Sequence, residues 1–97
     1  MSAAAFSVKD NIEVAGWPLS LGVQADAPVS TRTAVAVQRL LDAGAALIGK
    51  TNLPPYGGGI ETENAVFGRT SNPYDLARTV GGSSGGEAAT ISARSAR

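Results

Sequence analysis

Few side chains in this sequence can carry acid–base or nucleophilic chemistry. The 97 residues include no cysteine and no histidine, which excludes disulfides, thiolate zinc sites and a Ser-His-Asp triad formed within the chain. A general base from these residues must therefore be a carboxylate or a lysine. Lys9 and Lys50 are the two lysines of the chain, and each follows a short apolar run.

The stretch "GGSSGG", from Gly81 to Gly86, is the most unusual in composition. It is similar to a phosphate-binding loop, but such a loop carries a lysine after its last glycine, whereas this chain has Glu87, whose carboxylate would repel phosphate. A flexible turn is the usual role of a Gly/Ser run. This run, however, leads directly into an apolar segment. A flexible turn and a pair of functional serines, Ser83 and Ser84, both stay open on composition alone.

Lys9 is the stronger candidate for a general base. Most lysines are solvated and take no part in chemistry. Lys9 instead lies at the end of an apolar run, beside Asp10 and Asn11 in the sequence "VKDN". A lysine buried at such a position can lose its proton near neutral pH and act as a base.

Two apolar runs with similar polar ends predict strands. Residues 5–12 have the sequence "AFSVKDNI", and residues 45–52 have the sequence "AALIGKTN", of which the second is expected to be buried. Residues 27–44 predict a helix between them, capped by Ser30 or Thr31 and ended by Gly44. The apolar face of this helix is formed by Ala34, Val37, Leu40 and Leu41.

Strand, helix and strand in this order build a parallel sheet. Ligands of such sheets bind beyond the carboxyl ends of the strands, where Lys9 and Lys50 both fall. Residues 54–86 are predicted to be mostly irregular, and a loop of this length is usually functional. A further helix is expected directly after Gly86.

Composition favours part of a larger protein. Charged residues make up 16% of the chain, against about 25% in an average soluble domain. The eight basic and eight acidic side chains cancel and are scattered, which argues against nucleic acid or an anionic membrane as a partner. Because no signal peptide or membrane-spanning run is present, we expect a soluble cytoplasmic protein. The oligomeric state is not indicated by any pattern.

Three segments taken together resemble the amidase signature family, the Ser-cisSer-Lys hydrolases. These are "FSVKDNIEVAG", "GAALIGKTNLP" and "NAVFGRTSNPYDLARTVGGSSGGEAA", which follow one another from about Phe6 to Ala89. The resemblance implies an α/β fold, a mixed, largely parallel sheet flanked by helices, of which residues 1–97 form an incomplete part. It also implies hydrolysis of carbon–nitrogen bonds in small carboxylic acid amides, with no metal and no organic cofactor.

The resemblance assigns roles to individual residues. Lys9 would be the base, and Ser83, joined to Gly82 by a cis peptide bond, would relay a proton to it. Ser84 would form hydrogen bonds within the site. Lys50, Thr51 and Asn52 are expected to be structural, connecting the second strand to the long loop. The segment expected to line the acyl pocket consists of Tyr56, Gly57, Gly58, Gly59 and Ile60.

The nucleophilic serine of the family is not matched in this chain. The resemblance places it, with the oxyanion hole, in a further glycine-rich segment beyond Arg97, since Ser92 and Ser95 lack the glycine setting. We therefore expect residues 1–97 to be a partial domain, truncated at both ends, that folds marginally and is inactive alone. Two alternatives are the amide-transferring subunit that acts on misacylated transfer RNA and a non-catalytic αβ module that binds a small ligand.

Overall fold

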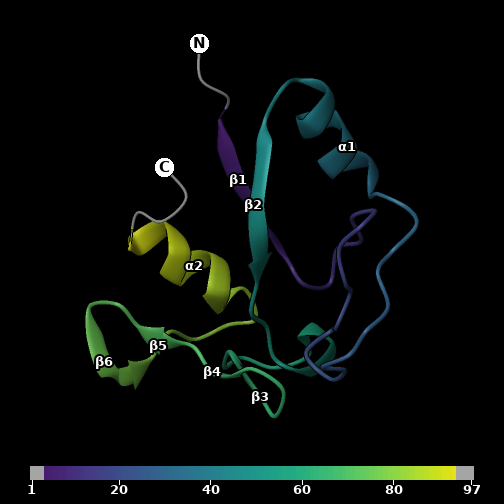
Figure 1. Ribbon diagram of the computed structural model, residues 1–97. Helices are drawn as coiled ribbons and strands as arrows, with labels where there is room; N and C mark the ends of the chain where they lie inside the picture. The colour runs from purple at the N-terminus through teal and green to yellow at the C-terminus, as the bar shows by residue number, and fades with distance from the viewer. Residues whose placement is uncertain (1–3, 94–97) are drawn as a thin grey trace.

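A computed structural model describes residues 4–93 of the chain. Strands β1 and β2 lie side by side, and helices α1 and α2 lie at opposite sides of them (Figure 1). The elements in chain order are β1 (Ala5–Lys9), α1 (Val35–Asp42), β2 (Ala46–Thr51), the 3₁₀ turn η1 (Pro55–Gly57), β3 (Glu63–Asn64), β4 (Gly68–Arg69), β5 (Ser71–Asn72), β6 (Asp75–Thr79) and α2 (Gly85–Ser92).

The predicted strand, helix and strand are confirmed. β1 and β2 pair in parallel, with Lys9 opposite Thr51 at the last position of each strand, and α1 connects them. The polar sequences that follow the two strands therefore meet at one edge of the sheet. The Asp10 N–H continues the pairing by donating to the Thr51 carbonyl at 3.1 Å. The chain has the α/β class that the sequence predicts.

Helix α1 begins later than predicted. Its N-cap is Ala34, and no side chain caps it, so the expected caps at Ser30 and Thr31 are wrong. The reason is tertiary: the Ser30 N–H donates to the Trp17 carbonyl at 2.9 Å, and the Gly16 N–H donates to the Ser30 carbonyl at 2.9 Å. Pairing with the 15–18 loop holds this segment extended, and the helix starts only after it.

The hydrophobic core is small and lies between β1 and α1. Val8, Val14 and Val37 are buried at its centre. Of the predicted apolar face of α1, Leu40 is exposed to 46%. The side chains that pack around the core are those of Phe6, Trp17, Ala34, Leu41 and Leu47.

Strand β2 is half-exposed, so the prediction that residues 45–52 form a buried strand is wrong. Ile48, at its middle, is exposed to 48%. In residues 4–93 the sheet has two strands, and each therefore has a neighbouring strand on one side. Full burial needs neighbours on both sides and helices over both faces.

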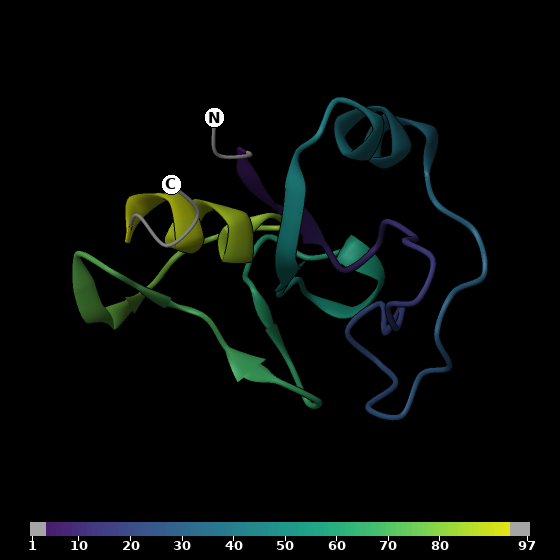
Figure 2. The ribbon, with the colours of Figure 1, turned by 45° about the horizontal axis from the view of Figure 1, so that its top comes forward.

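Residues 54–86 contain more regular structure than predicted. β3 pairs with β4 and β5 pairs with β6, both antiparallel, and the β5–β6 hairpin extends away from the parallel strands (Figure 2). Asparagines form the turns: the Asn64 side-chain oxygen accepts from the Val66 and Phe67 N–H groups, and that of Asn72 accepts from the Tyr74 N–H. Two-residue strands are too short to show a hydrophobic period, so these turns were the available signal.

Helix α2 begins at Gly85, two residues before the predicted start, and its first turn lies near the ends of β1 and β2 (Figure 1). None of the helices in residues 4–93 is both long and apolar enough to cross a membrane.

Candidate active site

The structure brings Lys9 together with both serines of the glycine-rich stretch. Lys9 lies at the end of β1, and its Nζ is 2.7 Å from the Ser83 Oγ and 3.0 Å from the Ser84 Oγ. The peptide bond between Gly82 and Ser83 is cis, as the resemblance implies. The separation of 74 positions in sequence is closed because β1 and the start of α2 lie against each other.

The loop Gly81–Gly86, which we call the glycine loop, is tightly held. The buried Thr62 hydroxyl donates to the Gly81 carbonyl at 2.6 Å and accepts from the Gly85 N–H at 3.0 Å. Gly81 has a φ of +80°, which glycine adopts without steric cost. A Cβ at Gly85 would lie 2.2 Å from the Thr62 Oγ1. These contacts distinguish the loop from a flexible linker and fix the direction of the two serines.

The second lysine has a different environment. The Lys50 Nζ forms an ion pair with Asp10 at 3.0 Å, and both side chains are about 10% exposed. Asp10 also accepts from the Ser20 hydroxyl, and Lys50 donates to the Pro18 carbonyl at 3.3 Å. The expected structural role of Lys50 agrees with these contacts. Within residues 4–93, Lys9 has no carboxylate partner.

Asn52 connects the end of β2 to the long loop, as predicted. Its side-chain nitrogen donates to the Gly68 carbonyl and to the Thr70 hydroxyl, both at 3.1 Å. Its side-chain oxygen accepts from Asn64 at 2.7 Å. The strand end that carries Thr51 is therefore fixed relative to the β3–β4 hairpin.

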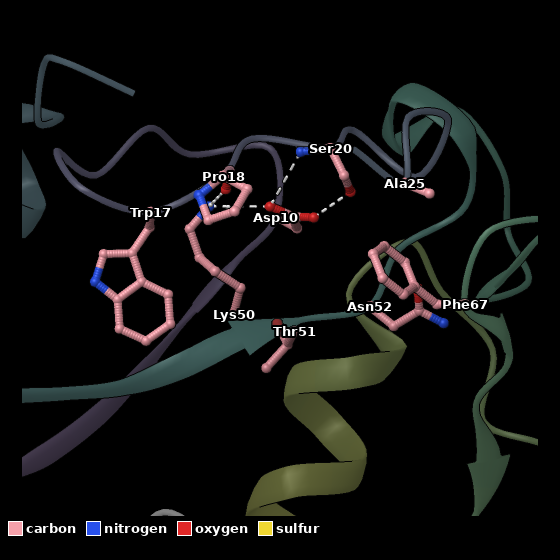
Figure 3. A pocket seen from close by; sticks show the side chains of 9 residues that line it. All are labelled: Asp10, Trp17, Pro18, Ser20, Ala25, Lys50, Thr51, Asn52 and Phe67. Atoms are coloured by element: carbon pink, nitrogen blue, oxygen red, sulfur yellow. Dashed lines mark hydrogen bonds and ion pairs between the residues drawn. The ribbon is translucent and has the colours of Figure 1, made fainter. Parts of the chain in front are cut away.

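A cavity of about 430 Å³ opens beside the Asp10–Lys50 pair, between Trp17 and Phe67 (Figure 3). Neither Lys9 nor Ser83 lines it. A smaller hollow of about 200 Å³ lies against the glycine loop. We consider the smaller hollow the better candidate for a reacting group, because a proton donor or acceptor must lie within hydrogen-bonding reach of its substrate. Its lining residues are Val80, Gly82, Ser84, Gly85 and Ala88.

The segment expected to line an acyl pocket lies elsewhere. Tyr56 is exposed to 69% and has a φ of +56°, and its N–H donates to the Leu21 carbonyl at 2.7 Å. Tyr56 to Gly59 line neither of the two cavities. The role of Tyr56, Gly57, Gly58 and Gly59 in an acyl pocket stays a prediction.

Three residues of the site were not given a role by the sequence. Thr62 holds the glycine loop, Asp10 pairs with Lys50, and Glu87 accepts hydrogen bonds from two strands. Asp10 had a signal, because it adjoins Lys9, but the other two had none in their local sequence. No group of three or more acidic side chains that could hold a metal ion occurs in the part of the chain that the structure describes.

Comparison with known proteins gives a family for this arrangement. The sequence model of the Amidase family matches residues 4–97. This chain belongs to the amidase signature family. Among its curated relatives is a glutamyl-tRNA(Gln) amidotransferase subunit of Methanosarcina acetivorans, which is 44% identical over 94 residues, 96% of this chain and 20% of the relative.

Solved structures agree with this membership of the amidase family. The glutamyl-tRNA(Gln) amidotransferase subunit of the same name from Thermotoga maritima has a TM-score of 0.85 and is 37% identical, over 92% of this chain and 20% of that one. A 6-aminohexanoate cyclic dimer hydrolase has a TM-score of 0.86 and is 36% identical, over 93% of this chain and 20% of the other. The chain thus spans about a fifth of these proteins, and it is about equally similar to the hydrolase and to the amidotransferase protein.

Proposed function

We propose that this amidase-family chain supplies two members, Lys9 and Ser83, of a Ser-cisSer-Lys relay that hydrolyses carboxylic acid amides. The observation that carries the proposal is the 2.7 Å contact between the Lys9 Nζ and the Ser83 Oγ. This separation lies within the range of about 2.6–3.2 Å over which general acid–base catalysis transfers a proton. The cis peptide bond at Ser83 supports the same assignment.

The proposed chemistry moves one proton along two hydroxyls to an amine. A nucleophilic serine gives its proton to the Ser83 Oγ as it attacks the amide carbonyl, and Ser83 gives its own proton to neutral Lys9. The protonated lysine then returns the proton by the same path to the leaving amine, and water releases the acid in a second round. Ser84, 3.0 Å from the Lys9 Nζ, holds the amine in place.

The charges around the site support a neutral Lys9. A carboxylate in contact with a lysine favours the protonated form, and such a lysine cannot accept a proton. Asp10, the nearest carboxylate in sequence, is engaged by Lys50 and Ser20. In residues 4–93 the partners of the Lys9 Nζ are the two hydroxyls.

We further propose that residues 1–97 alone are inactive, because the resemblance assigns the nucleophilic serine to a segment outside them. Incubation of the purified chain with a simple aryl amide should give no product above the uncatalysed rate. Turnover that is lost on Lys9→Ala would refute this part of the proposal, because it would show a complete active site within these residues.

The relay itself is tested in the longest polypeptide that the reading frame encodes. Lys9→Ala and Ser83→Ala should each lower kcat by about 10³-fold, the middle of the range for loss of a general acid–base group. Ser92→Ala, at the exposed end of α2, is the matched control and should keep full activity. A Lys9→Ala enzyme with undiminished kcat would exclude the relay.

The amidotransferase role is a second candidate, and the curated relative of that name supports it. The two functions differ in the acceptor of the amide nitrogen. Ammonia release that requires a misacylated transfer RNA would favour the amidotransferase. Release from a simple amide without RNA would favour the general amidase. A ligand that binds the longest polypeptide but is never hydrolysed would favour the non-catalytic module instead.

A further inference from the structure

Glu87 is the residue with the most hydrogen bonds across elements that the proposed chemistry does not use. It lies in the first turn of α2. Its Oε2 accepts from the Ser7 hydroxyl at 2.8 Å, and its Oε1 accepts from the Thr51 hydroxyl at 2.9 Å. Ser7 is on β1 and Thr51 ends β2, so one carboxylate joins the helix to both strands.

The Glu87 contacts run parallel to the contact between Lys9 and Ser83. Ser7 and Lys9 are two residues apart on β1, and their side chains therefore point to the same face of the sheet. On this face Ser7 contacts Glu87 and Lys9 contacts Ser83. The start of α2 is thus attached to β1 at two successive positions, and the position at Glu87 does not involve the reacting groups.

The packing around Glu87 leaves little freedom for the helix. A Cβ on the neighbouring Gly86 would lie 2.5 Å from the Asn52 backbone nitrogen, so α2 lies directly on the chain that follows β2. Glu87 is half-buried there, and a negative charge in the first turn of a helix is favoured by the helix dipole. Charged acceptors also form stronger hydrogen bonds than neutral ones.

We propose that Glu87 is a positioning residue that holds Ser83 at hydrogen-bonding distance from Lys9. It acts through the first turn of α2: its two hydrogen bonds fix the helix start on β1 and β2, and the helix start fixes the glycine loop. The inference rests on the proposed function for its purpose, but the distance that it concerns is measured without any turnover.

The experiment is nuclear magnetic resonance on the full 97-residue chain with labelled lysine and serine. Only Lys9 and Lys50 contribute lysine signals, so the Overhauser effect between the Lys9 Hε and Ser83 Hβ protons can be assigned with few labels. We expect this effect in the unchanged chain. It should be lost in Glu87→Ala, while the Lys50 signals stay in place.

Glu87→Gln separates hydrogen bonding from charge. The amide can accept from one hydroxyl and donate to the other, so the Overhauser effect should be retained. Its loss in this variant would overturn the proposal that hydrogen bonding positions the loop. Glu63→Ala, an exposed glutamate on β3, is the control for removal of a carboxylate and should leave the effect unchanged.

A second variant covers the case in which Glu87→Ala does not fold. Ser7→Ala combined with Thr51→Val keeps the carboxylate but removes both donors, and it should also abolish the effect. Retention of the Overhauser effect in either Glu87→Ala or the double variant would overturn the proposal. Failure of Lys9→Ala to lower kcat would instead refute the relay and leave this distance measurement valid.

Discussion

Replacing Gly86 by alanine tests how closely α2 must approach the end of β2. A Cβ at this position would lie 2.5 Å from the Asn52 backbone nitrogen, 2.6 Å from the Asn52 backbone oxygen and 3.0 Å from the Thr51 Cβ. Since two of these partners are backbone atoms, no change of rotamer relieves the overlap. The helix has to move away from the strand, and the glycine loop has to move with it.

Two opposing terms set the expected size of the effect. Alanine is favoured over glycine in a helix by about 1 kcal/mol at most. Overpacking of a tight contact typically costs about 1–3 kcal/mol, and the short backbone distances place this site at the upper end. The free energy of unfolding should therefore fall by about 2 kcal/mol, which corresponds to a decrease in Tm of about 8–16 °C for a domain of this length.

Urea unfolding followed by far-ultraviolet circular dichroism measures this loss. The matched control is Gly49→Ala on β2, because a Cβ there would have no atom within 4 Å and should leave stability unchanged or slightly raised. Four apolar side chains, Val8, Val14, Val37 and Leu53, form the buried core, so a loss of about 2 kcal/mol should also be visible in water as a smaller folded fraction. A Gly86→Ala chain as stable as the Gly49→Ala chain would refute the argument from close approach.

Two further substitutions test the contacts around the site. Asp10→Asn keeps the size of the side chain but leaves the buried Lys50 charge without a counter-charge, so the free energy of unfolding should fall by about 3 kcal/mol; Asp26→Asn, at an exposed loop position, is its control, and equal urea midpoints for the two variants would contradict the prediction. Thr62→Val removes the hydroxyl that bonds to both ends of the glycine loop and leaves two backbone groups unpaired, at a cost of about 2 kcal/mol; the exposed Thr31→Val should change nothing, and a Thr62→Val chain with unchanged stability would show that the loop is held by other contacts.

The strands and the spacing of the polar residues could be predicted because they depend on local pattern. An apolar run that ends in "KDN" or "KTN" predicts a strand end, and parallel pairing then brings Lys9 and Thr51 to the same edge. The start of α1 could not be predicted in this way. Ser30 has the right residue type for a cap, but its backbone pairs with Gly16 and Trp17, and that pairing depends on a loop far away in the sequence.

The sequence by itself determined which residues are candidates for chemistry. The absence of histidine and the motif around Ser83 led to Lys9 as the partner, and the two side chains are in contact. Only the tertiary structure decided how that contact is held. Glu87 accepts from Ser7 across 80 positions and from Thr51 across 36, and no local pattern encodes such pairs, because each depends on the folding of strands and helix onto one another.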